Sequence, residues 1–497
     1  MSKEPNHKIL LTTDQTLMSD YHQNEFLGFG TCAPSNVIPD WLYQSLFFPP
    51  MKIIDGLPLA APYGLRKIEA QLLVEGFDVL TVDSAHLTDY LENSKVLGIH
   101  VMDPFGLGPA STTFASILRE EPFTAQHFRN LMERPEIASA KKHGLKIIIG
   151  GPGVWQFKHK QKFVIEHGID CIVEGEAEKI IGKLMKTALN NNELPKHYQV
   201  ELKELPNLEE IPDIQRPSVN GLIEIGRGCC RGCQFCSVAL RPLRWYPYEK
   251  ILREITVNKK GCINLTGLHA EDVLLYGSKN TIPNDKAIIK LHRLVTEKCE
   301  TVYWSHCSIA AIAAKPALFR KTAELILQKQ TFWGAEIGIE TGSPELVKKV
   351  MPAKAHPFKV EEWPEIVHTS MGLMHDNNMI PACTLIVGLP QETEEDLIKT
   401  IALIDDLKSY RSLIVPLFFV PTGRFKDEDW FKRAKLNDLH QELLIKCMEH
   451  GFFWIDDIFD ITFYKQRYGL FMRPFYRLFI NIVKKKGRVT TARILKG

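Results

Sequence analysis

Residues 226–236 read GRGCCRGCQFC and place Cys229, Cys233 and Cys236 in a C-x3-C-x2-C pattern. The stretch follows an apolar segment of strand length, so the cysteines are expected in a loop at the carboxyl end of a strand. Three thiolates can hold three irons of a [4Fe–4S] cluster and leave the fourth iron open to an outside ligand. Zinc is the alternative, but it is usually held by paired CxxC units or Cys and His sets, and no separate second pair lies elsewhere in the sequence. The pattern predicts an iron–sulfur centre.

Segments of strand and helix type alternate around and after the cysteine loop. Strands are expected near residues 222–226, 263–268, 301–305, 332–339, 384–388 and 413–419, with helical patterns between them. Six strand–helix units are typical of a partial (β/α)6 barrel, whose working residues lie at the carboxyl ends of its parallel strands. The cysteines would then follow the first barrel strand.

The part of the chain before the barrel alternates in the same way. This alternation of strand and helix segments predicts an α/β domain with a doubly wound, Rossmann-like parallel sheet. A proline-punctuated stretch around Pro212 marks a linker, because proline lacks a backbone donor and ends regular elements. We therefore predict three parts: a doubly wound domain over residues 1–212, the partial barrel over 213–424, and a helical extension over 425–497.

With its cysteine loop and the strands that follow, the predicted barrel resembles the radical S-adenosylmethionine (SAM) superfamily. The resemblance implies that the amino and carboxylate groups of SAM bind the open iron. It also implies that an electron from the reduced cluster splits SAM into methionine and a 5′-deoxyadenosyl radical, which takes hydrogen from a substrate. Cys229, Cys233 and Cys236 would be the metal ligands of this catalytic centre. A ferredoxin or flavodoxin is the kind of electron donor such a centre needs.

Other residues of the barrel resemble SAM-binding positions of that superfamily. Phe235, before the last cysteine, would approach the adenine, and simple packing is the alternative. Glu271 is the first choice for the carboxylate that binds the SAM amino group, and Asp272 is the second; a solvated acidic loop is the alternative. Glu340 would face the ribose hydroxyls. Glu336 lies four residues earlier on the same strand face and could point into the barrel, where SAM or substrate would be its partner.

The segment LIVGLPQET resembles the apolar strand and glycine turn that lie against the adenine. Gly388 would let the main chain approach closely. Glu392 is expected to begin or cap the next helix.

The first domain resembles the cobalamin-binding domains that precede some radical SAM barrels. Gly150 and Gly151 in IIIGGPG, and Gly175 in VEGEAE, would let the main chain pass a nucleotide tail, and the loop 103–109 (DPFGLGP) could lie beneath a corrin ring. The Asp-x-His-x-x-Gly motif, which supplies a histidine ligand to cobalt, is absent. Cobalamin could bind without that ligand, or the domain could keep the fold without the cofactor. His100, alone in an apolar strand, is expected to be a core residue.

The end of the chain alternates aromatic and aliphatic residues with cations over residues 452–483. Such a stretch suits an amphipathic helix at a membrane surface, with rings at the acyl boundary and cations on the head groups. The alternative is a cap on the barrel, with the aromatic residues in its core. Pro474 would kink a continuous helix in either case.

Composition narrows the class of protein. The 497 residues are 45% hydrophobic and 24% charged, and no apolar run approaches the roughly 20 residues that cross a bilayer. The beginning of the sequence does not resemble a signal peptide, so a cytoplasmic location, with peripheral contact at a membrane surface, is expected. Eleven cysteines in such a chain are expected to be reduced. A net charge of +2 gives no indication of nucleic-acid binding.

Three functions agree with these patterns. The first is a radical SAM enzyme that acts on an unactivated carbon of a small molecule or lipid, forming or cyclising C–C bonds as in the similar archaeal tetraether lipid ring synthases. The second is a cobalamin-dependent C-methyltransferase. The third, of another class, is a non-catalytic iron–sulfur or corrin carrier, which would not need the carboxylates expected around SAM.

Overall fold

A computed structural model describes residues 8–34, 38–463 and 467–494, with the side chains of 463–472 and 488–494 left out. The chain forms two compact units. Unit 1 comprises Met1–Ile223 and Glu249–Ile263, and unit 2 comprises Glu224–Tyr248 and Asn264–Gly497. Among the described residues, no helix combines the length and apolar character needed to cross a bilayer.

Unit 1 is built on one parallel sheet with the strand order β4-β1-β5-β6-β7-β8. Its strands are β1 (Ile9–Thr13), β4 (Val79–Thr81), β5 (Val96–His100), β6 (Lys146–Gly150), β7 (Cys171–Glu174) and β8 (His197–Gln199). The chain runs from β1 to one side and then returns to β5 on the other, so the order reverses between these two strands. In doubly wound sheets, ligands bind at the carboxyl end of such a reversal.

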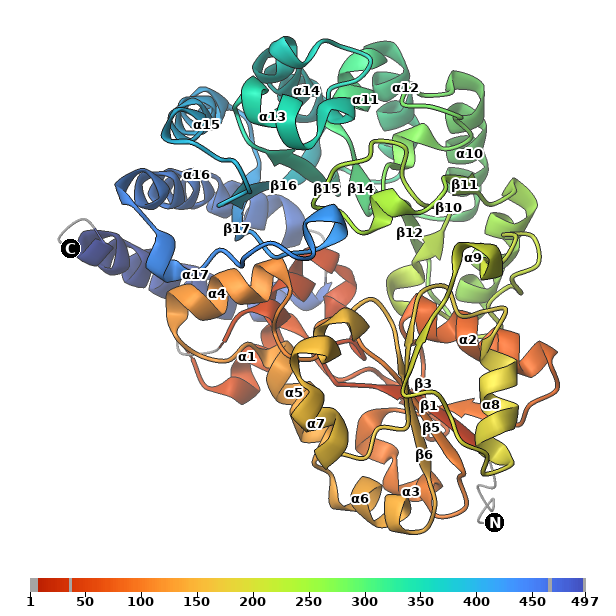
Figure 1. The fold of residues 1–497 in the computed structure, drawn as a ribbon. Coiled ribbons are helices and arrows are strands. Elements are labelled where there is room, and N and C mark those ends of the chain that lie inside the picture. The colour runs from red at the N-terminus through yellow and green to blue at the C-terminus, as the bar shows by residue number, and fades with distance from the viewer. Residues whose placement is uncertain (1–7, 35–37, 464–466, 495–497) are drawn as a thin grey trace. The chain divides into compact units, whose positions relative to one another are not determined.

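Helices cover both faces of this sheet (Figure 1). The helices of this unit are α1 (Asp40–Phe47), α2 (Tyr63–Val74), α3 (Thr88–Leu91), α4 (Pro109–Leu118), α5 (Phe123–Met132), α6 (Pro135–Lys142), α7 (Gln161–Glu166), α8 (Ile181–Leu189) and most of α9 (Tyr248–Lys260). A short hairpin pairs β2 (Ile53–Ile54) with β3 (Leu57–Pro58). Helices α2 and α8 lie together on one face, and α5 and α7 lie on the other. Coverage on both sides explains why all five residues of β1 are buried, as expected for a central parallel strand.

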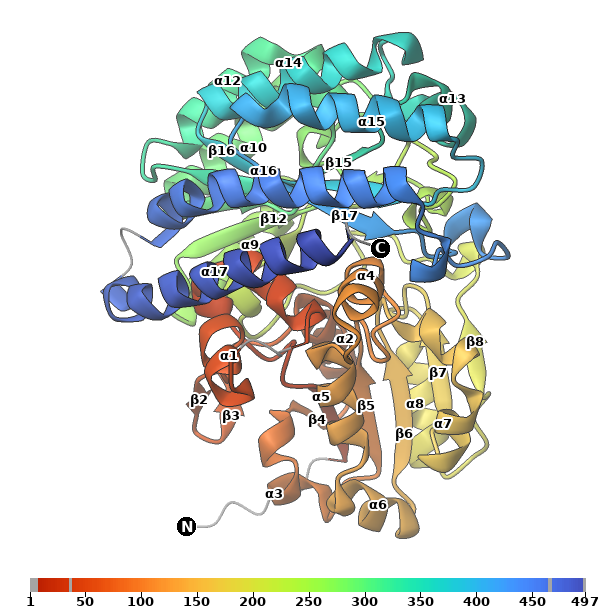
Figure 2. The ribbon, with the colours of Figure 1, turned by 90° about the vertical axis from the view of Figure 1, so that its left-hand side faces the viewer.

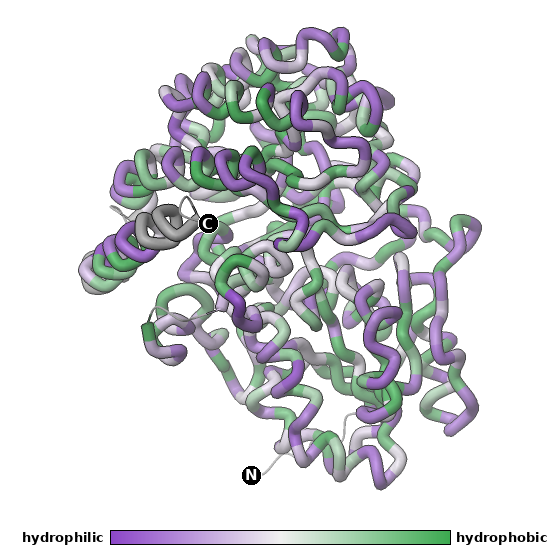
Figure 3. Tube along the Cα trace, turned by 60° about the vertical axis from the view of Figure 1, so that its left-hand side comes forward, coloured by the Kyte–Doolittle hydropathy of each residue, from purple (hydrophilic) through white to green (hydrophobic). Residues whose placement is uncertain are grey.

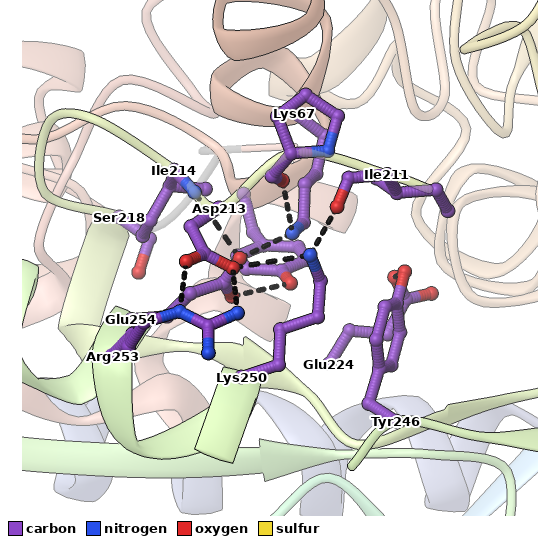
Figure 4. Close-up of polar contacts among 12 residues, drawn as sticks. Lys67, Ile211, Asp213, Ile214, Ser218, Glu224, Tyr246, Lys250, Arg253 and Glu254 are labelled. Atoms are coloured by element: carbon purple, nitrogen blue, oxygen red, sulfur yellow. Dashed lines mark hydrogen bonds and ion pairs between the residues drawn. The ribbon is translucent and has the colours of Figure 1, made fainter. Parts of the chain in front are cut away.

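Most of α9 packs in unit 1, although unit 2 both precedes and follows it in sequence. Lys250, Glu254 and Asn258 form a buried polar stripe along one face of the helix, at spacings of four residues. The stripe bonds to the segment 211–218 and to α2, as Figure 4 shows for Lys250 and Glu254. Nearly every polar group on this face therefore has a partner within unit 1.

Unit 2 contains two further parallel sheets. One has the order β13-β12-β9 and the other β14-β15-β16-β17. The strands are β9 (Ile223–Glu224), β12 (Leu265–His269), β13 (Thr301–Trp304), β14 (His306–Cys307), β15 (Trp333–Glu340), β16 (Met379–Val387) and β17 (Leu413–Phe418). Ser305 joins the sheets, because its N–H donates to the Leu268 carbonyl and its carbonyl accepts from the Glu336 N–H. The predicted parallel α/β character is confirmed.

The helices of unit 2 follow its strands along the chain (Figure 2). They are α10 (Asp285–Lys298), α11 (Ile309–Ala314), α12 (Pro316–Ile326), α13 (Pro344–Val350), α14 (Trp363–Asp376), α15 (Glu394–Asp406), α16 (Asp438–Phe463) and α17 (Arg467–Ile494). Helix α16 packs against α15 and β17. Apolar and polar residues alternate along α17 (Figure 3), and Pro474 lies inside this helix without ending it. Part of the predicted aromatic and basic segment, residues 464–466, lies outside the described residues.

Candidate metal and nucleotide site

The cysteine loop begins directly after β10 (Gly226–Arg227), which pairs with β11 (Arg244–Trp245) in a short hairpin. Cys229, Cys233 and Cys236 are free, half-buried thiols. The Cys236 N–H donates to the Cys233 carbonyl at 3.2 Å, which closes the last turn of the loop. Among the described residues, no three His, Cys, Asp or Glu side chains converge as they would around a single metal ion.

One glycine of this loop is required by its geometry. Gly228 has a φ of +82°, and a β-carbon added there would lie 2.2 Å from the Pro242 carbonyl oxygen. Any other residue would clash with this main chain and strain the backbone. The turn also lets the N–H of Arg231 point at the Cys229 Sγ, 3.5 Å away. A main-chain donor aimed at a sulfur is the kind of contact that supports a thiolate ligand.

All three thiols are harder to ionise than a free cysteine. Burial raises the pKa of Cys229 to about 12 and raises the pKa values of Cys233 and Cys236. Without a metal the loop therefore carries protonated thiols at neutral pH. Metal binding must release these protons, so loading is favoured at higher pH.

Arg231, between the first two ligand cysteines, fastens the loop to distant parts of unit 2. Its side chain is 5% exposed. The guanidinium donates to the carbonyls of Ala353 (3.2 Å), Lys354 (3.0 Å) and His356 (3.1 Å), to Ser308 Oγ (2.7 Å) and to Asp272 Oδ2 (3.4 Å). The predictions from sequence did not include this residue. The one feature of the sequence that could have identified Arg231 is its position between two predicted metal ligands.

The other end of the loop is clamped through its main chain. The Gln234 N–H donates to the Val350 carbonyl at 3.0 Å, and the Gln234 carbonyl accepts from the Arg424 N–H at 2.7 Å. Thr422 Oγ1 donates to the Phe235 carbonyl at 2.7 Å. Phe235 is thus fixed through its carbonyl, while its half-buried side chain follows the metal loop.

The two acidic residues after β12 differ in their surroundings. Asp272 is 4% exposed, and its Oδ2 accepts from Arg231 and from Ser308 Oγ. Glu271 is half-buried and has no hydrogen-bond or ion-pair partner among the described residues. Both donors occupy Asp272 Oδ2, and its buried Oδ1 has no hydrogen-bond partner among the described residues. Glu271 is the more exposed of the two carboxylates and stays the first candidate for a ligand, with Asp272 Oδ1 as the second.

Glu336 on β15 lies beside two histidines at neighbouring strand ends. Its Oε2 is 3.1 Å from His306 Nε2, and the rings of His306 and His269 are 5.9 Å apart. Burial opposes a charge on His306, but Glu336 overcomes it and raises the pKa of this histidine to about 9. Burial and the nearby His306 lower the pKa of His269. At neutral pH, a charged histidine–glutamate pair thus faces a neutral histidine.

Glu340 ends the same strand in a strained conformation. Its φ is +67°, and the pairing register shifts between Gly338 and Glu340. The buried carboxylate accepts from Lys354 Nζ at 2.8 Å and from Thr384 Oγ1 at 3.3 Å. A β-carbon at Gly338 would lie 2.1 Å from Glu340 Oε1, so the side chain folds back over the face that Glu336 also occupies. Strain of this kind in a non-glycine residue is concentrated at functional sites.

The glycine turn after β16 is filled by the chain itself. Gly388 has a φ of +80°, and a β-carbon there would lie 1.9 Å from the ring of Phe431. Its N–H donates to Glu392 Oε2 at 2.9 Å, and the same oxygen lies 3.2 Å from His440 Nε2. Helix α15 begins two residues after Glu392, with Thr393 as its N-cap. The expectation that Glu392 begins or caps that helix is therefore wrong, because it bonds back to the turn.

In unit 1, the predicted glycines lie at the carboxyl edge of the sheet: Gly150 is the last residue of β6, Gly151 follows it, and Gly175 follows β7. A β-carbon at Gly150 would meet only the Val173 carbonyl oxygen, 3.9 Å away, so this position leaves space. At Gly151 it would lie 2.4 Å from the Val101 carbonyl oxygen, and at Gly175 it would lie 2.8 Å from Val200 Cβ. Gly151 and Gly175 thus serve chain packing, and Gly150 is the one that leaves room for a ligand.

Two other features of this edge bear on a corrin ligand. The loop 103–109 is tied to itself, because Asp103 Oδ1 accepts from the Gly108 N–H at 2.9 Å. Residues 14–19 after β1 read DQTLMS and do not form the Asp-x-His-x-x-Gly motif. The ring of His100 packs beside Gly64 and Gly151, and burial lowers its pKa to about 4, so it is neutral.

Residues 223–404 match the family model described as the Radical SAM superfamily. The chain is 25% identical to a probable threonylcarbamoyladenosine tRNA methylthiotransferase of Methanocaldococcus jannaschii, over 69% of this chain and 74% of that protein. It is 23% identical to a tRNA-2-methylthio-N(6)-dimethylallyladenosine synthase of Thermosipho melanesiensis, over 53% of this chain. The match spans only 58% of that relative's length.

The fold is similar to that of a solved enzyme. A structure of the radical S-adenosylmethionine methyltransferase TsrM from Kitasatospora setae, with cobalamin and a [4Fe–4S] cluster bound, superimposes with a TM-score of 0.54. The match has 14% identity and covers 84% of this chain and 77% of TsrM. A second TsrM structure, with tryptophan and a SAM analogue bound, gives the same TM-score. At this identity the likeness concerns the fold.

Proposed function

We propose that the chain is a radical SAM enzyme that holds a [4Fe–4S] cluster on Cys229, Cys233 and Cys236, because residues 223–404 match the model of that superfamily. The observation that carries the proposal is the clamped cysteine loop beside an unpartnered Glu271. Bound together, cluster and SAM would supply a 5′-deoxyadenosyl radical that removes hydrogen from a carbon. The non-catalytic carrier is disfavoured, because a carrier has no use for these carboxylates.

Each residue of the site has a proposed task. Glu271 would accept from the SAM amino group, since Asp272 Oδ2 is occupied by Arg231. Glu340 would accept from the ribose hydroxyls, and Lys354 Nζ, 2.8 Å away, would hold its carboxylate in place. Phe235 would lie along the adenine, whereas the turn at Gly388 is already filled by the ring of Phe431. Glu336, paired with His306, would face the substrate.

Unit 1 is proposed to bind cobalamin. In support, its strand order reverses at the centre of the sheet, and Gly150 leaves space at the carboxyl edge. The Asp-x-His-x-x-Gly motif is absent from the sequence, so this chain would hold the cofactor without that histidine ligand. We further propose that the two parallel sheets of unit 2 form the partial (β/α)6 barrel, and we retain the domain limits 1–212, 213–424 and 425–497.

Methyl transfer is favoured among the proposed reactions. The solved structures of similar fold belong to a radical SAM methyltransferase, and the similar tRNA enzymes are methylthiotransferases. The substrate would be a small molecule or a lipid, and a ferredoxin or flavodoxin would supply electrons. Lipid modification remains the second candidate, because Phe475 and Leu478 on α17 are 46% and 55% exposed and would suit contact with a membrane surface from the cytoplasmic side.

Product analysis tests the proposal. The protein, reconstituted with iron and sulfide, is reduced without oxygen and incubated with SAM, and products are identified by mass. The expected product is 5′-deoxyadenosine, which Cys233→Ala should abolish. Cys262→Ala, which changes an exposed cysteine outside the loop, should retain it. Wild-type protein that binds the cluster but forms no 5′-deoxyadenosine would contradict the proposal.

A further inference from the structure

We infer that Arg231 is a positioning residue that holds the metal-ligand loop in its binding shape before the metal arrives. This inference rests on the proposed function. It concerns a side chain whose guanidinium bonds to none of the three sulfurs and acts on the loop through its other partners. Its own N–H contacts Cys229, while its guanidinium reaches three different parts of unit 2.

The first argument is the cost of placing a charge there. A guanidinium that is only 5% exposed has lost nearly all contact with water, and such burial is unfavourable unless partners replace the water. Three main-chain carbonyls, one hydroxyl and one carboxylate do so for the two terminal nitrogens, while Nε is buried without a partner among the described residues. A side chain with so many fixed acceptors has essentially one position, so the main chain that carries it is also fixed.

The second argument is the place of the acceptors. Ser308 and Asp272 follow β14 and β12, and the carbonyls belong to the turn at 353–356, which follows α13. The same turn contains Lys354, the partner of Glu340. One planar side chain therefore joins the cysteine loop, the acidic loop and the turn beside Glu340. A lysine carries all its donors on one nitrogen at the end of a flexible chain, whereas the guanidinium of an arginine holds its donors in a rigid, planar fork.

The third argument concerns the contacts that the cysteine loop would lose without the Arg231 side chain. Between Cys229 and Cys233, the described contacts of the loop with the rest of unit 2 come from this side chain, whereas Gln234 and Phe235 are clamped separately. Removing the guanidinium would free the first ligand cysteine while the later ones stay in place. It would also leave Asp272 buried beside Ser308 alone.

The test measures metal loading in variants of the full chain. Arg231→Lys and Arg231→Ala are compared with wild type, and Arg241→Ala is the matched control. Arg241 lies in the same loop region, and its half-buried side chain forms no hydrogen bond or ion pair among the described residues. Metal-free proteins are first compared by thermal unfolding. Each is then titrated with iron and sulfide against a chelator, and bound iron and the low-temperature spin resonance signal are recorded.

Wild type and Arg241→Ala are expected to bind iron alike, and both Arg231 variants are expected to lose about 10- to 100-fold in affinity, as for other residues that orient metal ligands. Ser308→Ala, which keeps Arg231 and removes one acceptor, should show a smaller loss, and it replaces Arg231→Ala if that variant does not fold. Arg231→Lys with wild-type affinity would overturn the inference. Failure of wild type itself to bind a cluster would instead overturn the proposed function.

Discussion

Glu340 shows how a single residue can carry both strain and function. Its left-handed φ of +67° costs of order 1–3 kcal/mol in a non-glycine residue, and the carboxylate is held by a buried lysine. The sequence predicted a carboxylate on this strand face, because side chains alternate along a strand. It could not predict Lys354, whose position beside Glu340 depends on a turn 14 residues later in the chain.

Breaking this pair should destabilise unit 2. Glu340→Ala leaves Lys354 buried without its carboxylate, so the free energy of unfolding in urea should fall by about 3–5 kcal/mol. Glu345→Ala removes an exposed carboxylate that pairs with Lys399 and should cost no more than about 1 kcal/mol. Equal effects in the two variants would contradict the described burial of the Glu340–Lys354 pair.

The His306–Glu336 pair predicts a pH effect. The pKa of His306 is about 9 in the folded protein and near 6.5 when unfolded, so the pair's contribution to stability is complete below pH 6.5 and is lost as pH rises toward 9. Because both side chains are partly exposed, the effect should be of the order of 1 kcal/mol. Urea unfolding from pH 6 to 10 measures it. Glu336→Gln should flatten this part of the profile, and an unchanged profile would contradict the pairing.

At the scale of elements, the buried central strands of both units could be predicted because they are short apolar runs bounded by turn residues, whereas the exposed β8, which reads HYQ, could not. The burial of the polar face of α9 could not be predicted in this way. Lys250, Glu254 and Asn258 read as the solvated face of an amphipathic helix, and only the fold shows that segment 211–218 covers them. Arg231 escaped prediction for the same reason, since its carbonyl partners lie 122 to 125 residues away in sequence.

The buried face of α9 makes a prediction for unit 1. Glu254→Gln removes the charge that faces Lys67, whose side chain is 2% exposed, and should lower the free energy of unfolding by about 3–5 kcal/mol. Glu249→Gln changes an exposed residue five positions earlier in the same helix and should alter the free energy of unfolding by no more than about 0.5 kcal/mol. A mild Glu254→Gln variant would mean that α9 is not held in unit 1 by this contact.

For the whole molecule, the match of residues 223–404 to the radical SAM superfamily agrees with what the cysteine spacing and the strands after it predicted. The three cysteines were identifiable because their spacing is a local property of the chain. The choice between Glu271 and Asp272 was not, because it depends on which carboxylate Arg231 occupies in the folded protein. The reaction and its substrate depend on side chains from many elements, which is why they are proposed on the basis of similarity.

The central claim is the open cluster on Cys229, Cys233 and Cys236. Low-temperature electron spin resonance of the reduced, anaerobically reconstituted protein tests it most directly, recorded without and with SAM. The account predicts a signal from a single [4Fe–4S] cluster whose shape changes when SAM is added, and its loss in Cys233→Ala. Wild-type protein that contains zinc or no metal in this loop, or a cluster signal that SAM leaves unchanged, would contradict it.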